Sequence, residues 1–395
     1  MSNVLILQLS RLGDLLQSTL LINSLKQQGK KVVLLGDEKN TAIANEIKLL
    51  DRFVPFEIGK LISLLKNKNY GKCYNELEKY VLFLNNENFA EIYNLNHSNI
   101  NYYLISLINA KIKKGFKTGD NKFIDFIYNV LINRKTNRFN LVDIFNFFSE
   151  KPIISNRIFI NKNIPDNNLN FINKISKGRK NIVVHLGAGH SLREWGVANF
   201  VALSEKILKQ FNVNILLTGS KNETHLGKKF FKLLNIKYRN SVLNLMGKTD
   251  IQMLKALLLH STLLISTDTG VMHLAAACET KIVALFYASA YVFETGPYLK
   301  KSLVITPCEE CYPCTEFHQN CRDIHCKKNI LIDDVAAAVK YMMGESSKKT
   351  LKKYFAARNN VILYEPYFDK FGICYKNILN NITFDKIREK GFGYA

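Results

Sequence analysis

Short apolar runs and longer stretches of helical periodicity alternate along most of this chain. The run at 4–9 is typical of a buried strand, and the stretch at 14–27 gathers its leucines and an isoleucine on one face, as an amphipathic helix does. The same alternation predicts strands at 32–36, 53–58, 89–95, 111–116, 182–186, 213–217, 243–246, 263–265 and 282–286, and helices at 41–50, 75–84, 98–109, 140–148, 197–211, 224–234, 251–260 and 329–343.

Strands that alternate with helices indicate a parallel sheet wrapped by helices on both faces, which is a doubly wound α/β fold. The alternation is interrupted at 151–180, where Pro152, Pro165 and several Asn and Lys residues leave only brief apolar segments. A chain of 395 residues is too long for one ordinary core. We therefore predict domains at 1–165 and 166–343, followed by a basic, aromatic extension at 344–395 that packs back across the first domain or lies on an anionic membrane.

The composition is that of a globular protein, with 47% hydrophobic residues and a mean hydropathy near zero. No uninterrupted apolar run is long enough for a transmembrane helix. The start, Met1-Ser2-Asn3, lacks the basic region and cleavage site of a signal peptide. We expect a cytoplasmic protein, with a peripheral position on the cytoplasmic face of the inner membrane as the alternative.

The chain is strongly basic, with 55 Lys and Arg against 33 Asp and Glu and a formal net charge of +22. Such a charge favours partners that carry phosphate, or an anionic membrane face, but a Lys-rich composition without any function explains it equally well. Nucleic acid is less well supported, because the lysines are scattered and no helix-turn-helix, RNP or zinc-finger pattern is present.

The most informative stretch is the polar turn that follows the apolar run at 263–265. Asp268, Thr269 and Gly270 lead into a helix of small residues that begins near Val271, so its first N–H groups can bind an anion. We expect the Asp268 carboxylate and the Thr269 hydroxyl to cap this helix, Gly270 to let a ligand approach the backbone, and His273 to face the same opening. An ordinary capped turn of a doubly wound sheet has the same pattern.

Two further turns carry candidate residues at the ends of predicted strands. Gly13 allows a close approach after the first strand, and Asp14 either caps the next helix or projects into a cleft. After the strand at 182–186 comes a Gly-Ala-Gly loop, then Arg193 and the single tryptophan, Trp195. We interpret Trp195 as a packing residue, and Arg193 as either a surface charge or a phosphate ligand.

The next two turns offer an acid and a base. Glu223 follows the strand at 213–217 and either accepts hydrogen bonds from ribose hydroxyls or stabilises the first turn of a helix. Lys248 stands in the loop Gly247-Lys248-Thr249 and is a candidate neighbour of a phosphate or nucleotide.

Five cysteines cluster within a short segment, at 308, 311, 314, 321 and 326. In a reducing compartment such a cluster points to metal more than to disulfides. Overlapping Cys-x-x-Cys units with two further thiols can supply a tetrahedral thiolate site for zinc or iron. A closed structural site, free thiols and an iron–sulfur cluster are all compatible with the pattern.

Three of these motifs, taken in order, resemble those of a known family. "LSRLGDLLQSTLLINSL" at the start, the Gly loop followed by Arg193-Glu194-Trp195, and "STDTGVMHLAAA" followed by "KIVALF" are similar to motifs of the ADP-heptose:lipopolysaccharide heptosyltransferases, glycosyltransferase family nine. The resemblance covers about residues 1–340. It implies a GT-B fold, in which two Rossmann-like doubly wound domains, one on the acceptor side and one that binds the nucleotide-sugar, face a central cleft.

The resemblance also implies roles for the candidate residues. Asp14 corresponds to the family's proposed catalytic base, and Arg193 replaces its usual Lys as a contact of the diphosphate. The residues expected to bind substrate are then Gly13, Arg193, Glu223, Lys248, Asp268, Thr269, Gly270 and His273. Cys311, Cys314, Cys321 and Cys326 would form a small metal-binding knuckle at 308–326, with Cys308 as an extra or substitute ligand.

The implied activity is inverting transfer of a heptose from ADP-heptose to a hydroxyl of a lipopolysaccharide core or related surface glycan. No Asp-x-Asp motif marks a catalytic metal. The chain departs from the family at Phe286-Tyr287-Ala288-Ser289, where an aromatic-Gly-Pro turn is common, so the sugar pocket is open to change. The alternatives are a GT-B transferase with another nucleotide-sugar or a protein acceptor, and a metal-stabilised nucleic-acid-binding protein.

Overall fold

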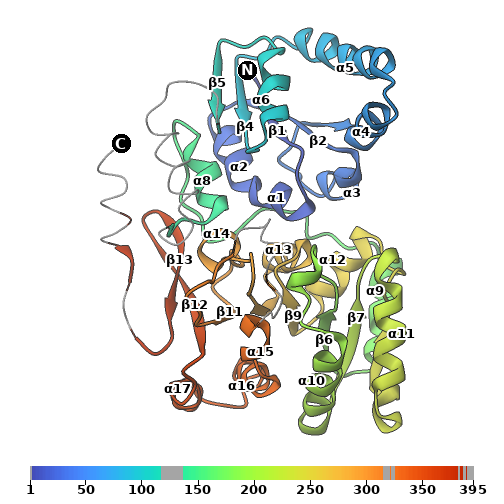
Figure 1. Ribbon diagram of the computed structural model, residues 1–395, viewed down its shortest axis with the longest axis vertical. Helices are drawn as coiled ribbons and strands as arrows, with labels where there is room; N and C mark the ends of the chain where they lie inside the picture. The colour runs from blue at the N-terminus through green and yellow to red at the C-terminus, as the bar shows by residue number, and fades with distance from the viewer. Residues whose placement is uncertain are drawn as a thin grey trace. The chain divides into compact units, whose positions relative to one another are not determined.

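The computed structural model describes residues 2–116, 137–314, 321, 325–380, 383–385 and 388. Contacts between residues divide the chain into two compact units (Figure 1). Among the described residues, the first unit consists of 2–116 and 141–161, and the second of 137–140 and those from 162 onward. The main division, after Asn161, lies near the predicted boundary at residue 165.

The first unit is built on a parallel sheet with the strand order β3-β2-β1-β4-β5. Its central strand is apolar on both faces, as buried parallel strands are, and Val4 to Leu7 are fully buried. The strands are β1 (Asn3–Gln8), β2 (Lys31–Asp37), β3 (Arg52–Phe56), β4 (Glu91–Asn94) and β5 (Ile112–Gly115). The helices are α1 (Leu12–Gln17), α2 (Thr19–Gln27), α3 (Thr41–Ala44), α4 (Ile58–Lys66), α5 (Tyr70–Asn85), α6 (Asn99–Ser106) and α8 (Leu141–Phe147).

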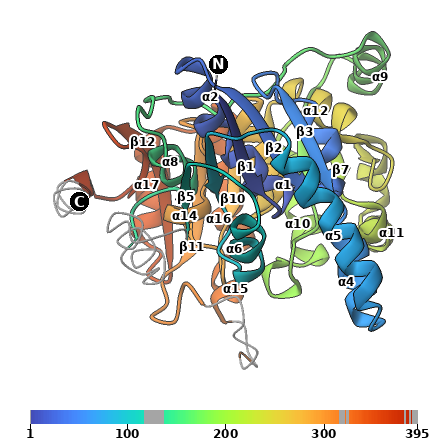
Figure 2. The same cartoon turned by 90° about the horizontal axis from the view of Figure 1, so that it is seen from above.

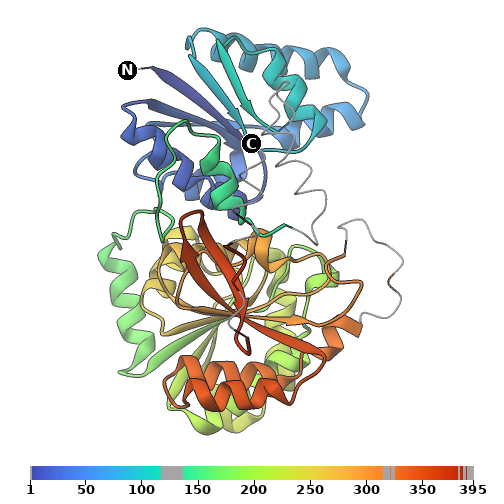
Figure 3. The same ribbon diagram turned by 90° about the vertical axis from the view of Figure 1, so that its left-hand side faces the viewer.

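Helices cover both faces of this sheet. α4, α5 and α6 share one hydrophobic cluster with the strands and lie outside them in Figure 2. α2 contacts β2 and α8 and covers the opposite face, as Figure 3 shows. The predicted helix at 14–27 is interrupted at Ser18, whose hydroxyl donates to the carbonyl of Leu15 at 2.6 Å.

The second unit contains a larger sheet with the order β13-β12-β11-β10-β9-β6-β7-β8. The strands from β6 to β11 are parallel, and β12 and β13 are antiparallel. The strands are β6 (Lys180–His185), β7 (Val213–Thr218), β8 (Val242–Asn244), β9 (Leu263–Thr267), β10 (Lys281–Leu285), β11 (Ser302–Pro307), β12 (Val361–Asp369) and β13 (Gly372–Asn377). The helices are α9 (Asp166–Ser176), α10 (Val197–Gln210), α11 (Thr224–Leu233), α12 (Ile251–Leu259), α13 (Gly270–Ala277), α14 (Val292–Thr295), α15 (His325–Asn329), α16 (Ile332–Met342) and α17 (Lys348–Ala356).

The described part of the predicted C-terminal extension belongs to the second unit. α17 packs on α16, and β12 and β13 continue the sheet beyond β11. Leu351, Phe355, Val361 and Leu363 are buried in the same hydrophobic cluster as β6 and β9. The expectation that this segment packs across the first domain is therefore wrong for α17, β12 and β13, because their apolar faces complete the second unit's own core. Residues 381–382, 386–387 and 389–395 lie outside the described residues.

Most predicted elements are present with shifted ends, whereas α4, α9, α14, α15, α17, β11, β12 and β13 were not predicted. The strand predicted at 111–116 is β5, which forms an edge of its sheet. None of the helices in the described part of the chain is long and apolar enough to cross a membrane.

Candidate active site

In both sheets the strand order reverses beside the first strand of the unit, between β1 and β4 and between β6 and β9. Loops that leave two such strands turn to opposite faces of the sheet, and the crevice between them is where open α/β sheets bind ligands. In the second unit, the loop after β6 carries Arg193 and the loop after β9 carries Asp268. The topology thus brings two of the predicted residues to one place.

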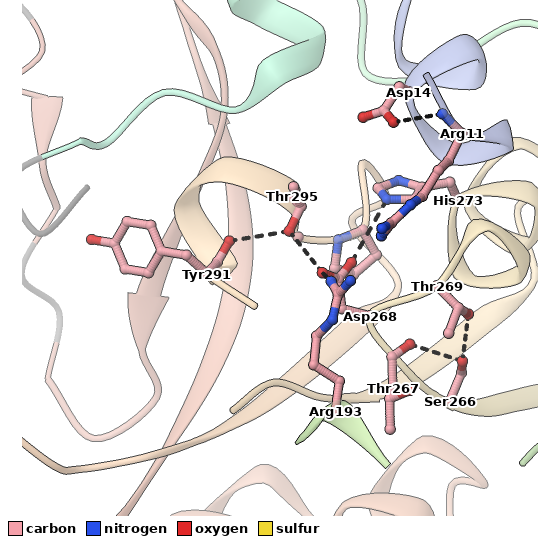
Figure 4. Close-up of polar contacts among 12 residues, drawn as sticks. Arg11, Asp14, Arg193, Ser266, Thr267, Asp268, Thr269, His273, Tyr291 and Thr295 are labelled. Carbon is pink, nitrogen blue, oxygen red and sulfur yellow. Dashed lines mark hydrogen bonds and ion pairs between the residues drawn. The ribbon is translucent and has the colours of Figure 1, made fainter. Parts of the chain in front are cut away.

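Arg193 and Asp268 form a buried ion pair (Figure 4). Arg193 Nη1 lies 2.9 Å from Asp268 Oδ2, and the hydroxyl of Thr295, on α14, donates to the same oxygen at 3.4 Å. Arg193 is therefore not a solvated surface charge. A buried carboxylate and a buried guanidinium would each be costly without a partner, so the pair fixes both side chains.

The predicted cap of α13 is absent. Thr269 is the N-cap residue, but no side chain caps the helix. The hydroxyl of Thr269 lies 3.0 Å from that of Ser266, and the Asp268 carboxylate is engaged by Arg193. The prediction that Asp268 and Thr269 cap this helix is wrong, because the buried guanidinium takes the carboxylate. The first N–H groups of α13, where the sequence predicted an anion to bind, are therefore not capped by the side chain of Thr269.

His273 lies on the first turns of α13, next to the ion pair. Its Nε2 is 4.0 Å from Asp268 Oδ1. Burial lowers the pKa of His273, against the opposing effect of the Asp268 charge, so the imidazole is neutral at pH 7. Within the described residues, neither His273 Nδ1 nor Arg193 Nε has a hydrogen-bond partner. Buried polar atoms without partners are rare, so these two nitrogens set the site apart from an ordinary packed core.

The turn after β10 holds the backbone of Arg193 through a hydrogen bond. The hydroxyl of Tyr287 donates to the carbonyl of Arg193 at 2.8 Å. The next residue, Ala288, has a φ of 54°, a left-handed conformation that favours glycine. This is the turn in which the chain departs from the aromatic-Gly-Pro pattern, and the structure shows that its tyrosine holds the backbone of the site.

The loops after β6 and β7 meet at Glu223. The Glu223 carboxylate accepts hydrogen bonds from the N–H and the hydroxyl of Ser220, both at 2.7 Å. Gly187 lies against it so closely that a Cβ atom there would overlap the carboxylate. The role of Glu223 in stabilising its own turn is confirmed, whereas its contact with a ribose stays a prediction.

His185, the last residue of β6, is buried beside Glu223. Its Nδ1 lies 3.2 Å from the hydroxyl of Thr218. Burial lowers the pKa of His185 to about 4, although the nearby Glu223 charge opposes this shift. His185 therefore presents a neutral imidazole at the carboxyl end of the sheet.

The loop after β8 lies beside the end of β7. The N–H of Gly247 donates to the carbonyl of Gly219 at 2.9 Å, and Gly247 has a φ of 72°. Lys248 follows and is exposed. Its contact with a phosphate or nucleotide stays a prediction.

In the first unit, Asp14 lies in the first turn of α1, after β1. Its Oδ2 accepts a hydrogen bond from the N–H of Arg11 at 3.1 Å, and the carboxylate remains partly exposed. Gly13 beside it is buried. At the same end of the sheet, Asn96 Oδ1 accepts from the N–H of Leu9 and the hydroxyl of Ser10. Asp14 thus caps its helix and lies at the strand reversal of its own unit.

The cysteine cluster is only partly described, since residues 315–320 and 322–324 lie outside the described residues. Burial raises the pKa of the Cys326 thiol, and the nearby Cys311 and Cys321 raise it further. Across the described ranges, no three His, Cys, Asp or Glu side chains are placed so that they could hold a metal ion. Cys311 and Cys321 thus lie near Cys326, and the metal site stays a prediction.

Three residues of the site were missed from the sequence. His185 had a signal, because it is a polar residue at the end of a buried strand just before a Gly-rich loop. Tyr287 also had one, because it directly follows the strand predicted at 282–286, in the turn that departs from the family pattern. Thr295 had none, because it reaches the site from a segment without clear periodicity. The packing role of Trp195 is confirmed: it is buried, and its indole N–H donates to the carbonyl of Ile330 at 3.2 Å.

Residues 86–325 match the sequence profile of glycosyltransferase family 9 (heptosyltransferase). The chain belongs to this family. It is 27% identical over 138 residues to the lipopolysaccharide core heptosyltransferase OpsX of Haemophilus influenzae, a stretch that covers 34% of this chain and 38% of OpsX. The chain therefore matches less than half the length of this curated relative.

Solved structures of glycosyltransferases share the fold. The structure of Escherichia coli ADP-heptose lps heptosyltransferase II matches 87% of this chain and 99% of its own, with a TM-score of 0.66 and 16% identity. The iron-containing dodecameric glycosyltransferase TibC of enterotoxigenic E. coli matches 88% of this chain and 80% of its own, with a TM-score of 0.52 and 11% identity. The predicted α/β, GT-B type fold with two Rossmann-like units is confirmed.

Proposed function

We propose that this protein is an inverting glycosyltransferase that moves a heptose from ADP-heptose to a hydroxyl of a lipopolysaccharide core or related surface glycan. The observation that carries the proposal is the buried group of Arg193, Asp268 and His273 at the strand reversal of the second unit. Membership of family 9 supports it, as does the ADP-heptose in the name of heptosyltransferase II.

The second unit binds the donor in this proposal. Arg193 gives only one Nη to Asp268, so its guanidinium keeps donors for a diphosphate. When the bond between the anomeric carbon and the diphosphate oxygen breaks, negative charge develops on that oxygen. Arg193 and the N–H groups at the start of α13 stabilise the charge, and His273 Nδ1 supplies a further hydrogen bond.

The first unit supplies the base. Asp14 takes the proton of the acceptor hydroxyl while the oxygen's lone pair attacks the anomeric carbon. ADP leaves from the opposite side of that carbon, so the configuration inverts. Glu223 binds the ribose, and Lys248 lies near the nucleotide.

Titration calorimetry with ADP-heptose, ADP, a UDP-sugar and a GDP-sugar tests the donor. We expect ADP and ADP-heptose to bind the wild type, and Arg193→Ala to weaken both by about tenfold to a hundredfold, since a hydrogen bond to a charged group contributes about 1.5–3 kcal/mol. Lys229→Ala removes one charge from the exposed surface of the same unit and is the matched control. Arg193→Lys keeps a cation beside Asp268 and guards against simple unfolding of the alanine variant.

Other outcomes separate the alternatives. Binding of a UDP- or GDP-sugar alone would preserve the fold and the chemistry but discard ADP-heptose. Failure to bind any nucleotide, together with nucleic-acid binding that falls steeply with salt, would overturn the proposal in favour of a binding protein. A hydroxyl of a protein in place of a glycan is distinguished by offering both acceptors to the active enzyme.

The proposal needs no catalytic metal, and the cysteine cluster has a structural role in it. In this proposal, zinc or iron is bound by the four thiolates of Cys311, Cys314, Cys321 and Cys326, with Cys308 as a substitute ligand. The thiols would have to move closer together than in the described structure. The name of TibC, which states that it contains iron, makes iron worth measuring. Elemental analysis of the purified protein, with Cys314→Ala alongside, tests this: a stoichiometric metal in the wild type alone supports the site.

A further inference from the structure

Most of the exposed large apolar side chains of the described chain lie on the first unit, between Ile62 and Ile112. Four of them flank the turn between α4 and α5, two on each helix: Ile62 is 45% exposed, Leu65 48%, Tyr70 63% and Tyr74 63%. Single exposed apolar residues are ordinary, but a group of this size on one hairpin indicates an interaction surface.

The neighbouring helix α6 has the same character. Ile100, Tyr103 and Leu107 recur at the spacing of one helical face, and all three are exposed. Asn85, at the end of α5, joins the two helices by accepting from the N–H of Asn109 at 2.6 Å and donating to the carbonyl of Leu107 at 3.2 Å. α4, α5 and α6 all pack on one face of the sheet (Figure 2). The sides of these helices that face away from the sheet therefore belong to the same surface of the first unit.

The α4–α5 hairpin is also basic, with five lysines and two glutamates from 58 to 85. Lys60 and Lys79 are paired with Glu76. Lys66 and Lys72, at the turn, are exposed and have no ion-pair partner among the described residues. Glu78, the other glutamate of the hairpin, is also exposed and accepts a hydrogen bond from the hydroxyl of Tyr74 at 3.2 Å. The charge beside the exposed apolar side chains is therefore mixed, with a positive balance that is greatest at the turn, where Lys66 and Lys72 lie.

We propose that the outer side of the α4–α5 hairpin and α6, which we call the docking face, binds an anionic lipid bilayer. Tyrosine and lysine beside leucine and isoleucine suit the boundary of such a bilayer: the apolar groups enter it, the tyrosine hydroxyls stay at the headgroups, and the ammonium groups meet lipid phosphates. A second copy of the chain fits less well, because a two-fold interface here would set lysines against lysines.

This inference goes beyond the proposed function and does not depend on sugar transfer. It also assigns the membrane contact to the docking face, whereas the sequence suggested the C-terminal extension. Within that extension, α17, β12 and β13 are built into the second unit. Their apolar side chains are consequently buried in the core of that unit, whereas those of the hairpin are exposed.

Flotation of the full chain with vesicles tests the proposal. We expect binding to vesicles of phosphatidylethanolamine with phosphatidylglycerol, and at least tenfold weaker binding to phosphatidylcholine alone, since each lysine near an anionic surface contributes about 1 kcal/mol. Lys66→Glu/Lys72→Glu and Leu65→Ser/Tyr70→Ser should each weaken binding by about tenfold or more. ADP binding should be unchanged in all variants, which separates this test from that of the donor site.

The second unit offers matched controls. Lys228→Glu/Lys229→Glu changes the net charge equally on the exposed side of α11. Leu233→Ser/Ile236→Ser removes apolar side chains that are 48% and 78% exposed. Both should bind vesicles like the wild type. Equal losses in the controls, undiminished binding by the hairpin variants, or no vesicle binding would each overturn the proposal. So would a wild-type dimer that the hairpin variants dissociate, which would assign the face to a second copy.

Discussion

At the scale of single residues, the site depends on how one buried carboxylate is shared. Asp268 lies 2.9 Å from Arg193 and 4.0 Å from His273, and burial keeps this histidine neutral despite the Asp268 charge. The carboxylate therefore pairs with the guanidinium, which is oriented before any ligand arrives. Such preorganisation reduces the cost of ordering a flexible cation on binding. Asp268 therefore positions Arg193, and its own contact with a substrate stays a prediction.

Gly187 tests how closely the loops after β6 and β7 must meet. In Gly187→Ala the new Cβ would overlap the Glu223 carboxylate, which would have to leave its hydrogen bonds to Ser220. We expect a loss of about 1–3 kcal/mol in the free energy of unfolding, as for overpacking elsewhere, with weaker binding of ADP. Urea denaturation and calorimetry measure the two effects.

A control and a rescue sharpen this prediction. Gly59→Ala, on α4, places a Cβ where nothing lies within 4 Å, and should stabilise the protein by up to about 1 kcal/mol. Removing the clashing carboxylate in Gly187→Ala/Glu223→Ala should recover the part of the stability lost to the overlap, but neither the hydrogen bonds to Ser220 nor the ADP affinity. If the double variant is as unstable as Gly187→Ala alone, the overlap is not the cause.

His185 makes stability depend on pH. Burial lowers its folded pKa to about 4, below the unfolded value of about 6.5, so the unfolded chain binds more protons between these values. Stability from this group is complete above pH 6.5 and is lost as the pH falls towards 4, by up to about 3 kcal/mol. His185→Gln should flatten this part of the profile.

Urea denaturation at pH 7 and pH 5 for both proteins isolates the histidine, since the carboxylates titrate in each. The wild type should lose more free energy of unfolding between the two pH values than His185→Gln does. Equal losses would show that His185 keeps its ordinary pKa.

At the scale of elements, the clearest feature is the way the chain ends the second sheet. The antiparallel strands β12 and β13 cover the outer edge of β11, and α17 packs on α16. Asp334 of α16 is fully buried and accepts hydrogen bonds from Arg358 and from the hydroxyl of Tyr354. A buried carboxylate with charged and polar partners ties the extension to the helix before it.

Phe355 measures how much this segment contributes. It is 1% exposed within the main cluster of the second unit, so Phe355→Ala should cost about 3–5 kcal/mol of unfolding free energy. Lys353→Ala, on the exposed side of the same helix, should change it by less than about 0.5 kcal/mol. Urea denaturation of both variants checks the difference; a Phe355→Ala protein as stable as Lys353→Ala would mean that α17 is an appendage.

The elements show where sequence reasoning works and where it stops. Strands such as β1 and β9 were predicted because each is an uninterrupted apolar run that ends in a polar turn. β12 contains Tyr364, Glu365 and Pro366 in succession, a pattern that does not alternate clearly, and its pairing with β11 is a contact between distant segments. Local periodicity cannot show which distant edge a polar strand will cover.

At the scale of the whole molecule, the motifs located the candidate site better than they described its contacts. The residues after β6 and β9 meet because the strand order reverses between them, and the order of strands follows from the doubly wound pattern. The Arg193–Asp268 pair was not predicted, because each residue has a plausible role alone: a phosphate ligand and a helix cap. Only packing decides that the carboxylate is taken by the guanidinium.

A substitution of Asp14 tests whether the first unit supplies the base while the second unit binds the donor. In Asp14→Asn the amide oxygen can still accept from the N–H of Arg11, so the first turn of α1 and the fold should persist. The amide cannot take a proton from the acceptor, so turnover should fall by about a hundredfold to ten-thousandfold, the range for loss of a general base. Donor affinity should stay unchanged, because the second unit carries the donor residues in the proposed function.

The contrast with Arg193→Ala makes this prediction specific to chemistry. One variant should bind ADP normally and transfer sugar poorly, and the other should lose ADP affinity. Calorimetry with ADP and a turnover assay at saturating donor measure the two properties in each protein. If Asp14→Asn turns over like the wild type, another group is the base; if it loses ADP affinity as well, the first unit takes part in holding the donor, and binding and chemistry are not divided between the units.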